Sequence, residues 1–135
     1  MIGYLNPKTV TVVISDPGAD NYYKIMRVPS RMDKIEIISA WAESDTTVTL
    51  GNGTGIALTL YNYGTAGTAV QTAGTLTSAL GGTAVTWTAA NPKSFTVSEG
   101  TMTASQYLVL KYDETGTVAP LNITVGIEYV DGVGA

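Results

Sequence analysis

The sequence predicts an all-β protein, a single-domain antiparallel β-sandwich of about eight to nine short strands. Apolar and polar residues alternate with a period of two along many short segments, as they do in strands with one buried face. Turn-forming Gly, Pro, Asn and Asp residues separate these segments. Thr, Gly and Tyr are abundant and helix-forming runs are rare. A length of 135 residues fits one core.

The alternation predicts the strands in chain order. It is clearest near the C-terminus, where Ile123, Val125 and Ile127 point one way and Thr124 and Glu128 point the other. Thr is the usual outward residue in the other segments. The predicted strands are residues 9–15, 22–28, 34–41, 47–50, 56–61, 85–88, 94–98, 106–112 and 121–129.

Two of these strands alternate less regularly. Residues 107–110 form a continuous apolar run within the strand 106–112, which predicts burial on both faces. Tyr22 and Tyr23 are adjacent in the strand 22–28, so they cannot both face inward. At least one of these two tyrosines is therefore expected at the surface.

The regions outside the strands set the predicted domain organisation. Residues 64–82 are rich in Gly, Thr and Ala and are predicted to be a long excursion between strands, a usual place for external contacts. Only Leu76, Ala79 and Leu80 have helical spacing, enough for one turn. The expected organisation is an N-terminal arm at 1–8, a sandwich domain at 9–130 and a flexible C-terminal tail at 131–135.

Composition argues against catalysis. The chain has no His and no Cys, which removes the commonest general base, the commonest metal ligand and the best nucleophile. Acidic neighbours occur at three predicted turns, Glu43 with Asp45, Asp113 with Glu114, and Asp16 with Asp20. Turns favour such residues for solvation and local hydrogen bonding. We therefore expect no enzyme, no catalytic residue, no cofactor and no metal site; the alternatives are a carboxylate-dependent glycosidase and a calcium site at Asp16 and Asp20.

Charge and hydropathy exclude two kinds of partner. The net charge is −4 and the isoelectric point about 4.5, so a broad surface for nucleic acid is not expected. No apolar run approaches the roughly 20 residues that span a bilayer, so no membrane association is expected. The N-terminus lacks the features of a signal peptide, and synthesis in the cytoplasm is expected.

Aromatic and basic residues supply the candidate interface, because Tyr, Trp and Arg are enriched where proteins bind one another. Trp41 and Trp87 share the parity of apolar neighbours and are predicted to lie in the core. A small basic cluster at residues 24–34 fits either protection of a strand edge or binding of an acidic partner. The candidate protein-interface residues are Tyr22, Tyr23, Tyr61, Tyr63, Arg27 and Arg31.

The C-terminal third carries a more particular arrangement. Residues 93–97 form a short strand, a turn follows, then residues 104–112, Gly116-Thr117 and the long strand that ends at residue 130. This arrangement resembles the small head decoration, or cement, proteins of tailed bacteriophages. The N-terminal half fits the same pattern more loosely, and the resemblance covers about half of the chain.

The resemblance implies a jelly-roll sandwich that assembles as a homotrimer. It also implies the function, a structural virion protein that binds the outer surface of the major capsid protein lattice and stabilises it. The implied location is the capsid surface of a virion assembled in the host cytoplasm. The alternative is a carbohydrate-binding or receptor-binding module of a virion fibre, suggested by the outward Tyr61 and Tyr63.

Overall fold

A computed structural model describes residues 7–17, 21–50, 55–65, 71–78, 85–116 and 122–131, and these form three antiparallel sheets. The first sheet has the order β1-β12-β3-β10, with β8 also paired to β3; its strands are β1 (Lys8–Ser15), β12 (Asn122–Asp131), β3 (Lys34–Ser44), β10 (Thr101–Thr103) and β8 (Lys93–Ser94). The second has the order β2-β11-β5-β6-β9; its strands are β2 (Asn21–Arg27), β11 (Tyr107–Thr115), β5 (Gly55–Asn62), β6 (Gln71–Ser78) and β9 (Thr96–Val97). The third sheet is the pair β4 (Val48–Leu50) and β7 (Val85–Trp87).

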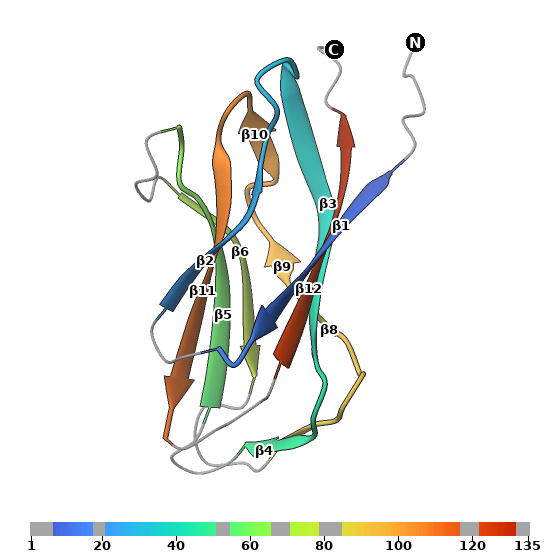
Figure 1. Ribbon diagram of the computed structural model, residues 1–135, viewed down its shortest axis with the longest axis vertical. Helices are drawn as coiled ribbons and strands as arrows, with labels where there is room; N and C mark the ends of the chain where they lie inside the picture. Colours follow the sequence, from blue (N-terminus) through green and yellow to red (C-terminus); the bar gives the residue numbers. More distant parts are fainter. Residues whose placement is uncertain are drawn as a thin grey trace.

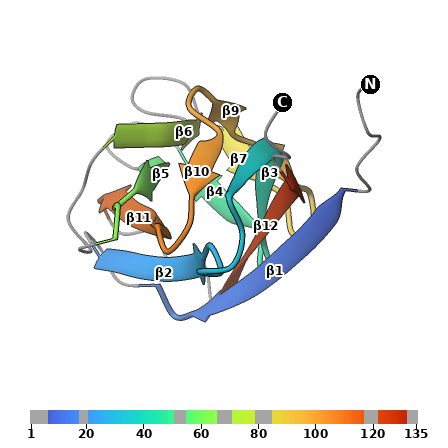
Figure 2. The same cartoon turned by 90° about the horizontal axis from the view of Figure 1, so that it is seen from above.

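The first two sheets pack face to face as the layers of a sandwich, and the small β4-β7 sheet lies at one end (Figures 1 and 2). The pairing is that of a long hairpin rolled up: β1 pairs with β12, β2 with β11, β3 with β8 and β10, and β5 with β6. This is the strand order of a jelly roll. The predicted all-β sandwich is confirmed, and the described residues contain no helix that could cross a membrane.

The core lies between the inward faces of the two large sheets. The predicted parity is confirmed on β12, where Ile123, Val125 and Ile127 are fully buried. It is also confirmed on β5, where Ile56 and Leu58 are fully buried. Burying one such side chain contributes about 1.5–3 kcal/mol, so packing supplies the stability that the absent disulfides do not.

A β-bulge in β3 makes one core prediction wrong. Ser39 pairs with Glu128 and Ile37 with Tyr129, so Ile38 is an extra residue and is exposed. The alternation reverses there, and Ala40 and Ala42 face the core in place of Trp41. Trp41 is half-buried on the outer face of the sheet.

Trp87 behaves as predicted. Its side chain is 1% exposed and its Nε1–H donates to the carbonyl of Asn91 at 3.2 Å.

The middle of the chain differs from the prediction in three ways. Residues 71–78, predicted to belong to the long excursion 64–82, form the strand β6, because β5 pairs with this segment on one side and β9 on the other. The predicted strand 94–98 is divided at the buried Phe95, since β8 pairs with β3 in one sheet and β9 with β6 in the other. The strand β10, which is only three residues long, was not predicted. Leu76 of the predicted helical turn lies in β6, and Ala79 and Leu80 lie outside the described residues.

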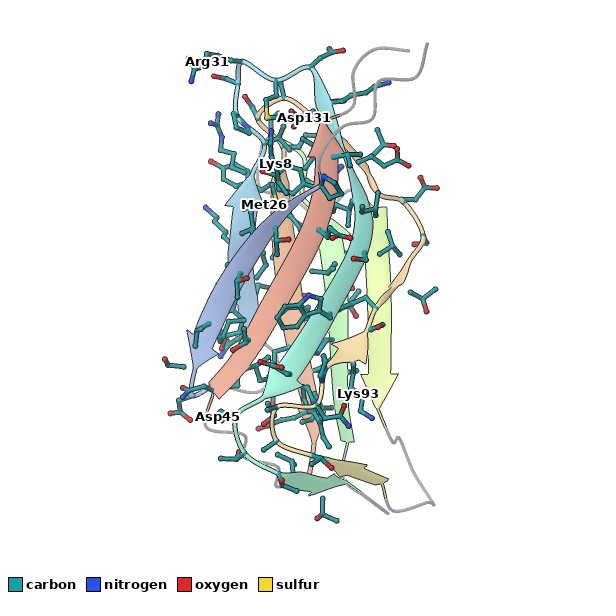
Figure 3. The ribbon with its side chains drawn as sticks, turned by 90° about the vertical axis from the view of Figure 1, so that its right-hand side faces the viewer. Lys8, Met26, Arg31, Asp45, Lys93 and Asp131 are labelled. Atoms are coloured by element: carbon teal, nitrogen blue, oxygen red, sulfur yellow. The ribbon has the colours of Figure 1, made fainter. Side chains whose placement is uncertain are left out.

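The start of the first strand and the end of the last strand lie side by side. Lys8 begins β1 and Asp131 ends β12, and the Lys8 ammonium is 2.8 Å from the Asp131 carboxylate (Figure 3). This pair is largely exposed, so it orients the strand ends and adds little stability. The predicted arm and tail remain predictions, since residues 1–6 and 132–135 lie outside the described part of the chain.

One strained turn predicts a stabilising substitution. Asn91 N–H donates to the Thr88 carbonyl at 3.1 Å, and Ala90 at the third position of this turn has a φ of 59°, in the left-handed region. Glycine adopts such a φ without steric cost. We expect Ala90→Gly to raise the free energy of unfolding by about 0.5–1 kcal/mol in urea titrations. The neighbouring Ala89→Gly is the control and is expected to give no gain; equal effects would contradict the turn geometry.

A buried tyrosine predicts how stability changes at alkaline pH. Burial, and then the hydrogen bond that its hydroxyl donates to Glu114 at 2.7 Å, raises the pKa of Tyr112 far above its usual range. An unfolded tyrosine releases its proton near pH 10, so the Tyr112 contribution is fully present below about pH 10 and is lost as pH rises further. Urea unfolding between about pH 9 and 11 is expected to show a steeper loss for the native chain than for Tyr112→Phe. Parallel pH profiles would contradict this burial.

Candidate functional site

The outer face of the β2-β11-β5 sheet carries a cluster of aromatic rings. Strand alternation turns Tyr22 of β2 and Tyr61 of β5 outward, and Tyr63 follows directly after β5. The ring centroid of Tyr63 lies 5.9 Å from that of Tyr22 and 5.8 Å from that of Tyr61. The Lys111 ammonium, from β11 between them, is 5.7 Å from the centroid of the Tyr22 ring. Residues far apart in the sequence therefore form one continuous aromatic surface.

A fourth ring extends this surface toward the other end of β2. The Lys24 ammonium is 4.8 Å and the Arg27 guanidinium 5.7 Å from the centroid of the Tyr107 ring. Val109, outward on β11 between the two groups, is only 2% exposed. The predicted burial on both faces is confirmed for Leu108, Val109 and Leu110, whereas Tyr107 at the start of the run is half-buried. We call this surface the tyrosine face; its members are Tyr22, Lys24, Arg27, Tyr61, Tyr63, Tyr107, Val109 and Lys111.

The tyrosine face presents neutral hydroxyls and positive charge. Burial, followed by the charge and hydroxyl hydrogen bond of Tyr22, raises the pKa of Tyr63, so its hydroxyl keeps its proton at neutral pH. The hydrogen bond with Asp113, 3.4 Å away, raises the pKa of Lys111, so the ammonium stays charged. The face therefore offers aromatic rings, hydroxyl groups and cationic side chains to a partner.

The structure brings together four of the six predicted interface residues. Tyr22, Tyr61 and Tyr63 are in ring contact, and Arg27 lies on the same face beside Tyr107. Tyr23 is on the inward side of β2, opposite Leu110, and packs against the core. The placement of Arg31 is also different: it lies in the turn between β2 and β3, at one end of the sandwich (Figure 3).

Sequence reasoning did not assign Tyr107 and Lys111 to this surface. Both alternate with Leu108, Leu110 and Tyr112, a signal that places them outward on β11. What the sequence lacks is the register that sets Lys111 opposite Tyr22 on one side and Thr59 on the other.

Three of the carboxylates at the predicted turns, Asp45, Asp113 and Glu114, form hydrogen bonds or ion pairs within the fold. Asp45 accepts hydrogen bonds at 2.9 Å from both the backbone N–H and the side-chain amide of Asn122. Glu114 accepts from Tyr112, and Asp113 is paired with Lys111. Among the described residues, no three acidic side chains lie close enough to hold a metal ion. Asp20 of the calcium alternative lies outside those residues.

The fold and this face define a jelly-roll protein with an aromatic, cationic sheet surface. No protein-family model matches the chain, and no curated protein matches it. One similar solved structure is of Bacillus endospore appendages, described as disulfide-linked pili, with a TM-score of 0.40, 18% identity and coverage of 95% of this chain and 91% of that chain. Another is of the infectious bursal disease virus Gx strain, with a TM-score of 0.33, 10% identity and coverage of 96% of this chain and 34% of that chain. Similarities at these TM-scores carry no argument about the function of this chain.

Proposed function

We propose that the chain is a structural virion protein that decorates a phage capsid and stabilises it, by binding the outer surface of the major capsid protein lattice. The observation that carries the proposal is the tyrosine face, a sheet surface on which four rings and three cations lie together. The C-terminal pattern that resembles phage cement proteins supports the same role. The jelly-roll strand order supports it too, because the resemblance implies that architecture.

The chemistry of the tyrosine face suits a protein partner. Tyrosine rings offer large contact areas with little side-chain entropy to lose, and Arg and Tyr are frequent interface hot spots. Lys24, Arg27 and Lys111 favour an acidic partner surface through long-range attraction. A sheet also holds these side chains on a rigid support, which keeps the entropy cost of binding low.

Repetition makes modest contacts sufficient for such a protein. A lattice presents many equivalent sites, and copies joined to one another bind with an effective concentration far above that of a single copy. We infer a homo-oligomer, with three subunits favoured, located on the capsid surface. The role requires no enzyme activity, cofactor, nucleic acid or membrane.

The direct test uses heads of the phage that encodes this chain, prepared from a mutant that lacks it. Purified protein is expected to sediment with expanded heads, saturably, and to raise the temperature at which the heads release DNA. Heads incubated with buffer are the control. Failure to bind heads or tails would overturn the proposal.

A further inference from the structure

A shallow hollow lies on the side of the sandwich opposite the tyrosine face. It has a volume of about 310 Å³ and is lined by Trp41, Glu43, Pro92 and Ser94. Trp41 and Glu43 are two residues apart on β3 and therefore share its outer face, and Ser94 of β8 pairs directly with Trp41. Figure 3 looks onto this side of the molecule, with β1, β12 and β3 in front.

Packing holds the Trp41 indole in place. Gly126 is its partner on β12, and a Cβ atom there would lie 2.2 Å from Cε2, 2.3 Å from Cζ2 and 2.6 Å from Nε1 of the ring. The indole therefore rests on the backbone of β12, in space that only glycine leaves open. The ring is half-buried, so part of it stays accessible from the hollow.

The polar groups of the hollow are unused by the fold. Within the part of the chain that the structure describes, the side chains of Trp41, Glu43 and Ser94 make no hydrogen bond or ion pair. By contrast, Glu128 on the same sheet accepts a hydrogen bond from Ser39 at 3.2 Å. The hollow thus combines an accessible aromatic ring with a carboxylate and a hydroxyl that have no partner among the described residues.

We propose that this hollow binds one pyranose ring of a neutral glycan. Such a ring has an apolar C–H side that fits an aromatic surface and hydroxyl groups around its rim. Glu43 accepts hydrogen bonds from these hydroxyls, and a charged acceptor makes such bonds strong. Ser94 both donates and accepts. The volume is at the low end for ligand sites, which suits one sugar ring and not a long chain.

The charge of the hollow selects among sugars. Glu43 repels uronic and sialic acids, so neutral hexoses are favoured. A Lys or Arg side chain from a peptide would also be attracted by Glu43 and Trp41. Such a side chain would leave Pro92 without a contact, and it offers no acceptor for the Ser94 hydroxyl. The proposal does not depend on capsid binding, because it uses the opposite sheet and other residues.

The two tryptophans make binding measurable. Trp87 is 1% exposed whereas Trp41 lines the hollow, so a bound sugar changes the fluorescence of Trp41 alone. We expect titration with neutral glucose, galactose and mannose oligosaccharides to give a saturable change for at least one series. A single ring site implies a Kd of about 0.1–10 mM.

Three variants test the assignment. Trp41→Ala is expected to abolish binding, and because this variant lacks the fluorescent ring, its binding is measured by sugar-observed NMR. Glu43→Gln keeps the shape of the site and is expected to weaken binding at least about tenfold. Thr9→Ala, at an exposed position of β1 on the same sheet, is the matched control and is expected to bind normally. The proposal is overturned if no neutral sugar binds, if Glu43→Gln binds as well as the native chain, or if only a Lys-rich or Arg-rich peptide binds. Glu43→Gln removes no packing and is expected to fold normally. If Trp41→Ala fails to fold, the Glu43→Gln variant therefore still decides the test.

Discussion

Gly100→Ala is expected to lower the free energy of unfolding by about 3 kcal/mol, because its Cβ has no space. A Cβ on Gly100 would lie 2.4 Å from the carbonyl oxygen of Ile37. The Ile37 N–H donates to the Gly100 carbonyl at 2.8 Å, so the two backbones are held together at this point. Ile37 is 3% exposed in the core strand β3, which prevents β3 from moving away.

Urea unfolding followed by far-ultraviolet circular dichroism measures this loss. The control is Gly116→Ala, an exposed glycine with a φ of 78°, for which only the cost of the backbone conformation of about 1 kcal/mol is expected. Equal losses for both variants would contradict the close approach of the Gly100 backbone to the Ile37 carbonyl.

Replacing Tyr22, Tyr61 and Tyr63 together by alanine is expected to weaken binding to capsid heads at least about 100-fold. The three rings are in mutual contact on the tyrosine face, so their removal takes away its largest apolar area. Tyr22 is 52% exposed, and none of the three rings belongs to the buried core, so the fold is expected to persist. Co-sedimentation with heads at several protein concentrations measures the change.

The matched control replaces three outward residues of β1, on the other sheet. Thr9, Thr11 and Val13 are exposed and lie on the same side of β1. Their combined substitution by alanine is expected to leave head binding unchanged. If this control lost binding and the tyrosine variant kept it, the binding surface would be the β1-β12-β3 sheet.

Period-two alternation was enough to predict the sandwich and the inward residues of β5 and β12. It failed at Trp41 because one extra residue, Ile38, reverses the alternation, and a bulge depends on how the partner strand pairs. It also failed at β6, whose Thr, Ala and Gly residues give weak hydrophobic periodicity. That segment is a strand because the backbone of β5 pairs with it.

The candidate site was predictable only in part, for a related reason. Alternation identified Tyr61 and Tyr63 as outward residues, but the contact of Tyr63 with Tyr22 depends on β11 lying between β2 and β5. That strand order follows from the rolled hairpin as a whole and not from any local pattern. The hollow at Trp41 depends on the bulge in β3 and on Gly126 across the sheet, so its position also required the structure.

An electron cryo-microscopy reconstruction of a phage head that carries the chain tests the central claim most directly. The tyrosine face is expected to lie against the capsid shell, with Tyr61 and Tyr63 in the contact and Trp41 on the side that faces solvent. A reconstruction in which the β1-β12-β3 sheet meets the shell and the tyrosines face solvent would contradict the claim.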